Sequence, residues 1–239
     1  MIWQIQMLEK KVVILIVEGP SDKDALEYYL EKLSATHRIH FHVTNGDILY
    51  KKTEIQKIVN RAMGRALDEL RKNKILPSDV SAVFMITDTD GVFISDDRLT
   101  ITPKRSKFHY AANTIEVPSE SAKKDAIENR TDRRACLNLL HRTPSIKYQN
   151  REYDFGIYYF SCNLEHCTLN NPNTNDKDKC ERAVQFASSI KSIKEFIAFF
   201  EPFAVAGTYD ETWAYIKERN HSLSRCTNIQ LLIDKLITA

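Results

Sequence analysis

Glycine is scarce in this chain, with only 6 among 239 residues, and neither an internal repeat nor a low-complexity segment is present. This composition excludes collagen-like, repetitive and glycine-rich flexible chains. The longest apolar run, Val12 to Val17, is far shorter than the roughly 20 residues that a membrane-spanning helix needs. Lys10 and Lys11 precede that run as in a signal peptide, but Glu18 follows it directly and no small-residue cleavage site is present. We therefore expect a cytoplasmic protein that makes no membrane contact.

Cysteine is also sparse, and its pattern excludes a disulfide framework. There are 5 cysteines, an odd number at irregular spacing, and no Cys-x-x-Cys pair that is typical of zinc sites. Two metal-site alternatives stay open: histidines within residues 37–42, and a zinc site formed by four side chains of one C-terminal segment. Those four are Cys162, His166, Cys167 and Cys180.

Charge is nearly balanced over the whole chain, with 34 Lys and Arg against 32 Asp and Glu and a net charge of +2. Residues 98–151, however, contain 12 Lys and Arg against 5 Asp and Glu, so this segment has a net charge of +7. A local basic excess beside carboxylates suits a metal-dependent enzyme that acts on a polyanion. A solvated surface with scattered lysines is the alternative.

Two short segments, residues 12–22 and 82–91, are each a continuous apolar run that ends in carboxylates and a glycine. Such runs are typical of strands buried on both faces of a parallel sheet. Ligand sites in such sheets lie beyond the carboxyl ends of the strands. If the two strands are neighbours, one edge of the sheet collects the carboxylates of Glu18, Asp22, Asp88 and Asp90.

The pair Asp88 and Asp90 suits one hard cation. Alternate residues of a strand share a face, and Mg²⁺ takes one or two carboxylates while it keeps several waters. A divalent ion would also relieve the repulsion between crowded carboxylates. Gly91 permits a sharp turn after the acids. The alternatives are helix-capping acids, an ordinary Asp-Gly turn, and a calcium loop, although this last lacks a ligand before the glycine.

The order of apolar patterns along the chain predicts β-α-β-α-β in the first part, with parallel strands and right-handed crossovers. Ser21 is expected to cap the first helix, with Asp24 as the acid of the capping box, and Asp210 is expected to cap the helix at 210–219. Expected strands cover residues 12–17, 40–44, 82–87 and 153–161, with a strand or loop at 98–102. Expected helices cover residues 22–33, 53–74, 122–140, 181–200, 210–219 and 229–236. Residues 1–11 are expected to be an edge strand or a partner contact.

The residues 17–22 (Val-Glu-Gly-Pro-Ser-Asp), followed by 88–91 (Asp-Thr-Asp-Gly), resemble the signature of the TOPRIM family. That family includes topoisomerases, DnaG-type primases, OLD-family nucleases and small RNA-maturing nucleases. The segment 161–167 and the C-terminal helix also resemble RloB-like TOPRIM proteins, which are found near restriction and abortive-infection systems. The segment differs from the RloB-like pattern because it has no proline and has Leu164 before the acid.

The resemblance implies an α/β fold: a Rossmann-like TOPRIM fold with a mostly parallel central sheet flanked by helices. We expect a single TOPRIM-type domain over residues 1–239. Its core would cover 12–97 and 152–170, with a basic insertion at 98–151 and a C-terminal helical part at 180–239. This length leaves little room for the additional domains that the topoisomerase and primase resemblances would require.

The resemblance further implies a Mg²⁺-dependent nuclease, with Mn²⁺ as an alternative ion, that hydrolyses phosphodiester bonds of DNA or RNA. It implies a phage-defence (abortive-infection) effector that works with a separate AAA- or ABC-type ATPase, since this chain has no Walker motif. An oligomer is compatible with this role. The implied site consists of Asp88 and Asp90 as metal ligands, Glu18 as a ligand or general acid/base, Asp22 as a ligand of a second ion, and Glu165, assisted by His166, near the metal.

Basic residues of the segment 98–151 are the candidates for nucleic-acid binding. Lysine and arginine can hold phosphates, and aromatic residues can stack on unpaired bases. In the basic, aromatic stretch 103–110 the candidates are Lys104, Arg105 and Lys107. On the helix expected at 122–140 we expect Arg130, Arg133 and Arg134 to be exposed, and the last two to contact phosphates. The alternative function is a non-catalytic nucleic-acid-binding or regulatory subunit of an ATPase-containing complex.

Overall fold

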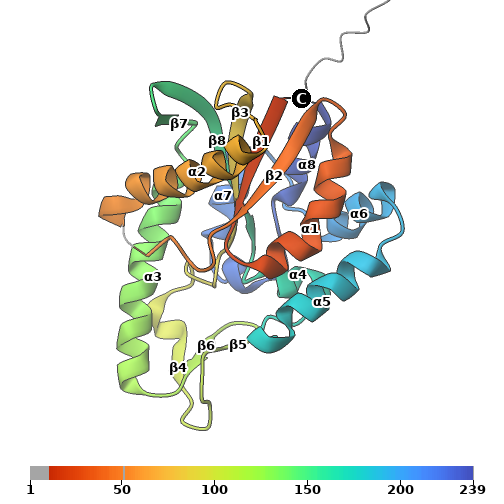
Figure 1. The fold of residues 1–239 in the computed structure, drawn as a ribbon. Coiled ribbons are helices and arrows are strands. Elements are labelled where there is room, and N and C mark those ends of the chain that lie inside the picture. Colours follow the sequence, from red (N-terminus) through yellow and green to blue (C-terminus); the bar gives the residue numbers. More distant parts are fainter. Residues whose placement is uncertain (1–10, 51, 239) are drawn as a thin grey trace, which may run out of the picture.

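The computed structural model describes residues 11–50 and 52–238, which form an α/β structure around a five-stranded sheet (Figure 1). The strand order is β2-β1-β3-β8-β7. Four strands run parallel, and only β7 pairs with its neighbour β8 in the antiparallel sense. The predicted α/β class with a mostly parallel central sheet is therefore confirmed. The strands are β1 (Lys11–Val17), β2 (His37–Val43), β3 (Val80–Asp88), β7 (Ser145–Tyr148) and β8 (Arg151–Phe160).

Alternate residues of the central strands pack into two cores, one on each face of the sheet. On one face, Ile14 and Ile16 of β1 pack with α2 (Ile55–Lys72), the end of α3 (Glu120–Leu140) and α7 (Tyr209–Ile216). On the other face, Val13 and Leu15 pack against a second group of helices. Those helices are α1 (Pro20–Leu33), α4 (Leu164–Leu169), α5 (Asp176–Ser189), α6 (Ile193–Phe200) and α8 (Ile229–Thr238). Because both faces are covered, the central strands β1 and β3 are apolar over most of their length.

A second, three-stranded sheet in the order β4-β6-β5 lies beyond the carboxyl ends of the central strands (Figure 1). Its strands are β4 (Leu99–Ile101), β5 (His109–Tyr110) and β6 (Ile115–Val117). It has a small core of its own with Ile94, Cys162 and Leu223. The described residues also form four short 3₁₀ helices, at η1 (Lys52–Glu54), η2 (Asp96–Arg98), η3 (Glu201–Phe203) and η4 (His221–Leu223).

Several boundaries differ from those expected. The strand β7 pairs with β8, so the end of the segment 98–151 is part of the central sheet rather than of an insertion. The single helix expected at 181–200 is wrong. The chain is extended at Ile190, and Ser192 starts a new helix by accepting a hydrogen bond from the Glu195 N–H.

Two predicted helix caps also change. The first helix is capped at Gly19, whose N–H donates to Asp22, and not at Ser21. The helix expected at 210–219 is capped by Thr208. The expectation for residues 1–11 falls almost entirely outside the described residues. Within the described ranges, no helix is long and apolar enough to cross a membrane.

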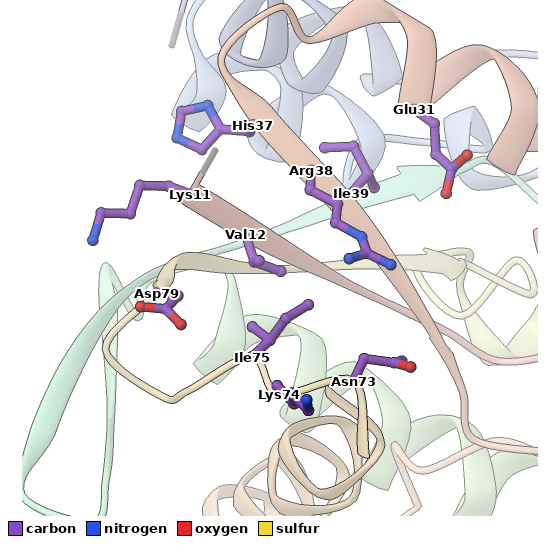
Figure 2. Close-up of a pocket in the computed structure, with 10 residues that line it drawn as sticks. All are labelled: Lys11, Val12, Glu31, His37, Arg38, Ile39, Asn73, Lys74, Ile75 and Asp79. Atoms are coloured by element: carbon purple, nitrogen blue, oxygen red, sulfur yellow. The ribbon is translucent and has the colours of Figure 1, made fainter. Parts of the chain in front are cut away.

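The amino ends of β1 and β2 border a cavity of about 720 Å³ (Figure 2). Its basic side chains, Lys11, Arg38 and Lys74, are accompanied by the carboxylates of Glu31 and Asp79. Charges of both signs alternate around it, so it has no strong preference for a polyanion. It lies at the opposite end of the strands from the carboxylates that the sequence singles out.

Candidate active site

Five carboxylates meet at the carboxyl edge of the central sheet. Because β1 and β3 are adjacent and parallel, Glu18 and Asp88 leave the sheet at the same edge. Asp22 comes from the first turn of α1, Asp90 follows β3, and Glu165 lies in the first turn of α4. The charges of the other four all raise the pKa of Asp88, in addition to the larger effect of its burial. The structure thus brings together all the acids that the sequence analysis proposed.

The turn after β3 is hydrogen-bonded to the end of β8 and the residues that follow it. Asp90 has a positive φ of 47°, and its N–H donates to the Cys162 carbonyl at 2.8 Å. Gly91 also has a positive φ, of 62°, and a Cβ there would lie 2.6 Å from a methyl carbon of Leu223. Only glycine fits this conformation and this space without strain. The turn therefore fixes the direction in which the Asp90 side chain leaves the sheet.

Arg133 supplies a positive charge within the carboxylate cluster. Its side chain is only 6% exposed, and it donates to Glu18 Oε1 at 2.8 Å and to the Asp88 carbonyl at 2.7 Å. It forms further ion pairs with Asp90, at 3.3 Å, and with Asp47. Burial alone would lower the pKa of Arg133, but these carboxylates outweigh it and raise the pKa well above its usual value.

The expectation that Arg130 and Arg133 are exposed is wrong, because the face of α3 that carries them packs against the carboxyl edge. Arg130 is buried and donates to the Ile94 carbonyl at 2.8 Å. Arg134 is 34% exposed and donates to the Val92 carbonyl at 2.9 Å. All three arginines thus have partners within the chain.

Glu18 is held by two donors on one of its oxygens. The Thr87 hydroxyl and the Arg133 guanidinium both donate to Glu18 Oε1. Burial raises the pKa of Glu18, and the charges of Asp47 and Asp90 add to this, whereas Arg133 opposes it. The result is a carboxyl group with a raised pKa at a fixed position, as general acid/base groups often have.

Three of the acids, Asp22, Asp88 and Glu165, form no ion pair within the described part of the chain. Asp22 accepts only the Gly19 N–H, and Asp88 Oδ1 accepts the Leu164 N–H at 3.0 Å. Glu165 is 5% exposed, and its carboxylate has no hydrogen-bond partner among the described residues. Burial, and then repulsion from Glu18 and Glu165, raise the pKa of Asp22 to about 7. No arginine pairs with this half of the cluster, and Asp22 and Asp88 therefore hold their protons more strongly than ordinary carboxyl groups do.

Lys179 of α5 is the basic side chain on the uncompensated side. Burial alone would lower its pKa, but the charges of Glu165 and Asp88 outweigh this effect and raise it. Lys179 therefore stays protonated, at the wall of a cavity of about 470 Å³ that Asp88, Asp90 and Lys107 also line.

A second cavity, of about 310 Å³, lies on the other side of Asp90 and reaches Asp47, Tyr50 and Arg133. Asp90, Phe108 and Tyr110 line both cavities. The Tyr110 hydroxyl donates to Asp90 Oδ1 at 3.1 Å. The two cavities are therefore neighbours that share the carboxylate of Asp90.

The segment that carries Tyr110 is joined to the segment before α5. The Tyr110 N–H donates to Asn173 Oδ1, and the Asn173 amide donates to the Tyr110 carbonyl, both at 2.8 Å. Lys107 donates to Asn175 at 3.1 Å. These bonds position the basic loop beside the carboxylates, although the two segments are more than sixty residues apart in sequence.

Lys104 and Arg105, which were also predicted to contact nucleic acid, do not line either cavity. Lys104 is exposed, and Arg105 forms an ion pair with Glu116. Sequence reasoning missed Lys179 and Asp47. Lys179 precedes the helix expected at 181–200, and Asp47 follows an Asn-Gly turn, so neither has a feature that distinguishes it in sequence from a solvated charge.

No family model, curated protein or solved structure matches this chain. The candidate site therefore rests on its own geometry.

The side chains of the cluster lie near one another, but they do not have the arrangement of a formed metal site. Within residues 11–50 and 52–238, no group of three or more His, Cys, Asp and Glu side chains is arranged to hold a metal ion. The cysteines proposed for zinc are free thiols, and of these Cys162 and Cys167 are buried and Cys180 is exposed. His40 and His42 instead bond to Glu69, at 3.1 and 3.2 Å.

The carboxylate cluster nevertheless has the chemistry that a divalent ion requires. Its donors are hard oxygens, and the Glu165 side chain is only 5% exposed. The raised pKa values of Asp22 and Asp88 show that these groups lack countercharge. A Mg²⁺ ion would supply that charge, with Asp22, Asp88 and Glu165 turning toward it.

Proposed function

We propose that this chain is a metal-dependent nuclease of the TOPRIM type, which hydrolyses phosphodiester bonds of DNA or RNA at the carboxyl edge of its sheet. The observation that carries the proposal is the partly buried cluster of Glu18, Asp22, Asp88, Asp90 and Glu165. Two of these acids, Asp88 and Asp90, border a cavity that Lys107 and Lys179 also line. Acids for a cation, beside lysines for phosphate, form the arrangement that hydrolysis of a polyanion needs.

When bound, Mg²⁺ or Mn²⁺ would stabilise negative charge on the phosphate and lower the pKa of a coordinated water. Asp22, Asp88 and Glu165 would hold the ion. Glu18, whose raised pKa suits it to proton transfer, is the candidate general acid/base through Oε2, because Oε1 is taken up by two donors.

Arg133 and the two lysines of the cavity have different roles in this proposal. Arg133 orients Glu18 and Asp90 and is not free to leave them without a large electrostatic cost. Lys179 and Lys107 face the cavity, so they are the groups that would bind phosphate oxygens. Arg133 thus acts as a positioning residue rather than as a direct phosphate contact.

The test is a cleavage assay with supercoiled DNA, single-stranded DNA and total RNA, each with Mg²⁺, Mn²⁺ or EDTA. Asp88→Asn removes a central charge and keeps the shape of the side chain. Asp68→Asn is the matched control, because Asp68 is 68% exposed on α2. We expect the wild type and Asp68→Asn to cleave one substrate class in the presence of metal only, and Asp88→Asn to be at least about 100-fold slower. Equal cleavage by all three proteins would contradict the proposal.

The wider biological role is proposed from the resemblance to RloB-like proteins. In this role the chain is a cytoplasmic phage-defence effector that a separate ATPase activates. Stable copurification with that ATPase, and cleavage that requires it, are the expected results. Full activity of the isolated chain would argue against an obligatory ATPase.

A second candidate function is a non-catalytic nucleic-acid-binding or regulatory subunit. The ion pairs of Arg133 favour it, because they neutralise part of the cluster without a metal. On this hypothesis, Asp88→Asn would leave binding of nucleic acid or of the ATPase unchanged, and no substrate would be cleaved under any metal condition.

A further inference from the structure

We propose that the site takes single-stranded nucleic acid, with one unpaired base in the 310 Å³ cavity and the adjoining phosphate in the 470 Å³ cavity. This inference rests on the proposed function, since it names the substrate class of the same edge. It is carried by the chemistry of the two cavities and by their connection.

The walls of the smaller cavity suit a flat heterocycle. Its volume of about 310 Å³ is at the lower end of the range of small-molecule sites. Apolar and aromatic side chains form most of the wall, and the polar side chains of Asp47, Asp90, Asn129, Arg130 and Arg133 form the rest. The apolar and aromatic ones are Tyr50, Val92, Leu99, Phe108, Tyr110, Ile115 and Ala126.

Two of these aromatic residues are exposed to solvent in a way that core packing does not explain. Tyr50 is 56% exposed and Phe108 is 42% exposed, and both border the smaller cavity. They come from different parts of the chain, since Tyr50 precedes α2 and Phe108 precedes β5. Exposed aromatic rings are the typical platforms on which single-stranded bases stack.

Polar groups suited to a base edge lie at the same wall. Arg130 is 6% exposed, and its Nε and Nη1 have no hydrogen-bond partner among the described residues, although Asp96 lies 3.9 Å from Nε. Asn129 beside it is exposed and has both donor and acceptor atoms. A base with ring nitrogens and carbonyl oxygens would satisfy these donors, whereas a purely apolar ligand would not.

The connection between the cavities matches the connectivity of a nucleotide. Asp90, Phe108 and Tyr110 line both, so a ligand that stacks on Phe108 in the smaller cavity lies next to the cavity that Asp88 and Lys179 line. In a duplex the bases are paired and stacked, and to place one in the smaller cavity it would have to be flipped out at a cost in free energy. A single strand avoids that cost, so the geometry favours it.

The test is a binding measurement by fluorescence anisotropy in EDTA, so that no cleavage occurs. The probes are a labelled single strand, the same sequence as a hairpin duplex, and the same strand with one abasic position, in DNA and RNA forms. The variants are Tyr50→Ala and Phe108→Ala. Tyr28→Ala is the matched control, because Tyr28 is also 56% exposed but lines neither cavity.

We expect the single strand to bind at least about tenfold more tightly than the duplex, and each variant to weaken single-strand binding by about 5- to 150-fold. Tyr28→Ala should bind as the wild type does. An abasic strand should bind the wild type more weakly, and Phe108→Ala should reduce that remaining affinity less than it reduces binding of the intact strand.

Duplex binding as tight as single-strand binding, or unchanged affinity in both variants, would overturn the inference. The two proposals fail separately. Phe108-dependent binding of single strands by a protein that never cleaves them would contradict only the nuclease. Metal-dependent cleavage of duplex that is indifferent to Phe108→Ala would contradict only the single-strand inference.

Discussion

The guanidinium of Arg133 lies among the carboxylates of Glu18, Asp47 and Asp90 and is almost fully removed from solvent. A buried ion pair contributes little net stability compared with an apolar pair of the same shape, because desolvation offsets the attraction. Removal of one partner is costly, however, since it leaves buried charges uncompensated. The free energy of unfolding therefore depends on the ion pairs between Arg133 and the carboxylates of the candidate site.

We expect Arg133→Met to lower the free energy of unfolding by about 3–5 kcal/mol, as measured by urea denaturation in EDTA. Arg71→Met, which removes an ion pair whose arginine is 43% exposed, should cost at most about 1 kcal/mol. Added Mg²⁺ should restore more stability to Arg133→Met than to the wild type, because it supplies the missing charge. Equal losses in the two variants would mean that the cluster does not depend on Arg133.

Asp22 gives the candidate site a dependence of stability on pH. Its pKa in the folded protein is about 7, raised by burial, against 3.8 in the unfolded chain. Between these pH values the folded protein binds more protons than the unfolded one, so stability falls as pH rises from about 4 to about 7.

Asp22→Asn removes this charge and keeps an oxygen that can accept the Gly19 N–H. In EDTA, we expect the variant to gain stability relative to the wild type as pH rises through this window, by a few kcal/mol at most. Urea denaturation at pH 5 and at pH 8 measures the difference, with Asp68→Asn as the exposed control. A constant difference between wild type and variant across pH would contradict the raised pKa.

At the scale of elements, the segment 106–110 and the segment 172–175 flank the carboxylates as a pair. The two hydrogen bonds of Asn173 to the Tyr110 backbone join them. The first segment contributes Lys107 and Phe108 to the 470 Å³ cavity, and the second contributes Pro172 and Thr174. Their mutual position, rather than their folding, therefore depends on Asn173.

We expect Asn173→Ala to lower kcat/KM for metal-dependent cleavage by about tenfold, since the loss of about 1.4 kcal/mol of positioning corresponds to that factor. Hydrogen exchange of the Tyr110 amide should become faster, while the melting temperature changes little. Asn60→Ala, which removes an exposed side-chain pair with Gln56 on α2, should change neither quantity. Unchanged cleavage together with faster exchange would show that the two segments act independently.

The elements that sequence predicts best are those whose pattern depends on burial alone. β1 and β3 are continuous apolar runs because helices cover both faces of the sheet. The break between α5 and α6 was missed because the apolar spacing of residues 183–200 continues at the helical period across it. The cap at Ser192 and the extended Ile190 interrupt the helix without interrupting the pattern. β7, with only four residues, is too short for its alternation to be recognised.

At the scale of the whole molecule, the five acids of the cluster are predictable from sequence, whereas the positions of most of the basic residues are not. Glu18 and Asp88 follow adjacent parallel strands, so topology alone brings them together. Arg133 and Lys179 reach the same edge from α3 and α5, and the tertiary packing of those helices decides which of their many charged residues point inward. Lysines and arginines that are periodic on a helix look alike in sequence, whether they are solvated or buried.

The uneven charge of the molecule leads to a last prediction, on salt dependence. Binding of a single strand should weaken linearly in log K against log salt, by about 0.7 for each phosphate that a basic residue neutralises. If Lys107 and Lys179 each hold a phosphate, the double variant Lys107→Gln, Lys179→Gln should reduce the magnitude of the slope by about 1.4. Lys177→Gln, two residues away on the exposed face of α5, should leave the slope unchanged. Anisotropy titrations in EDTA over a range of salt measure all three slopes.

An unchanged slope in the double variant would mean that other basic residues, such as Lys104, bind the phosphates. The nucleic acid would then bind away from the carboxylate cluster.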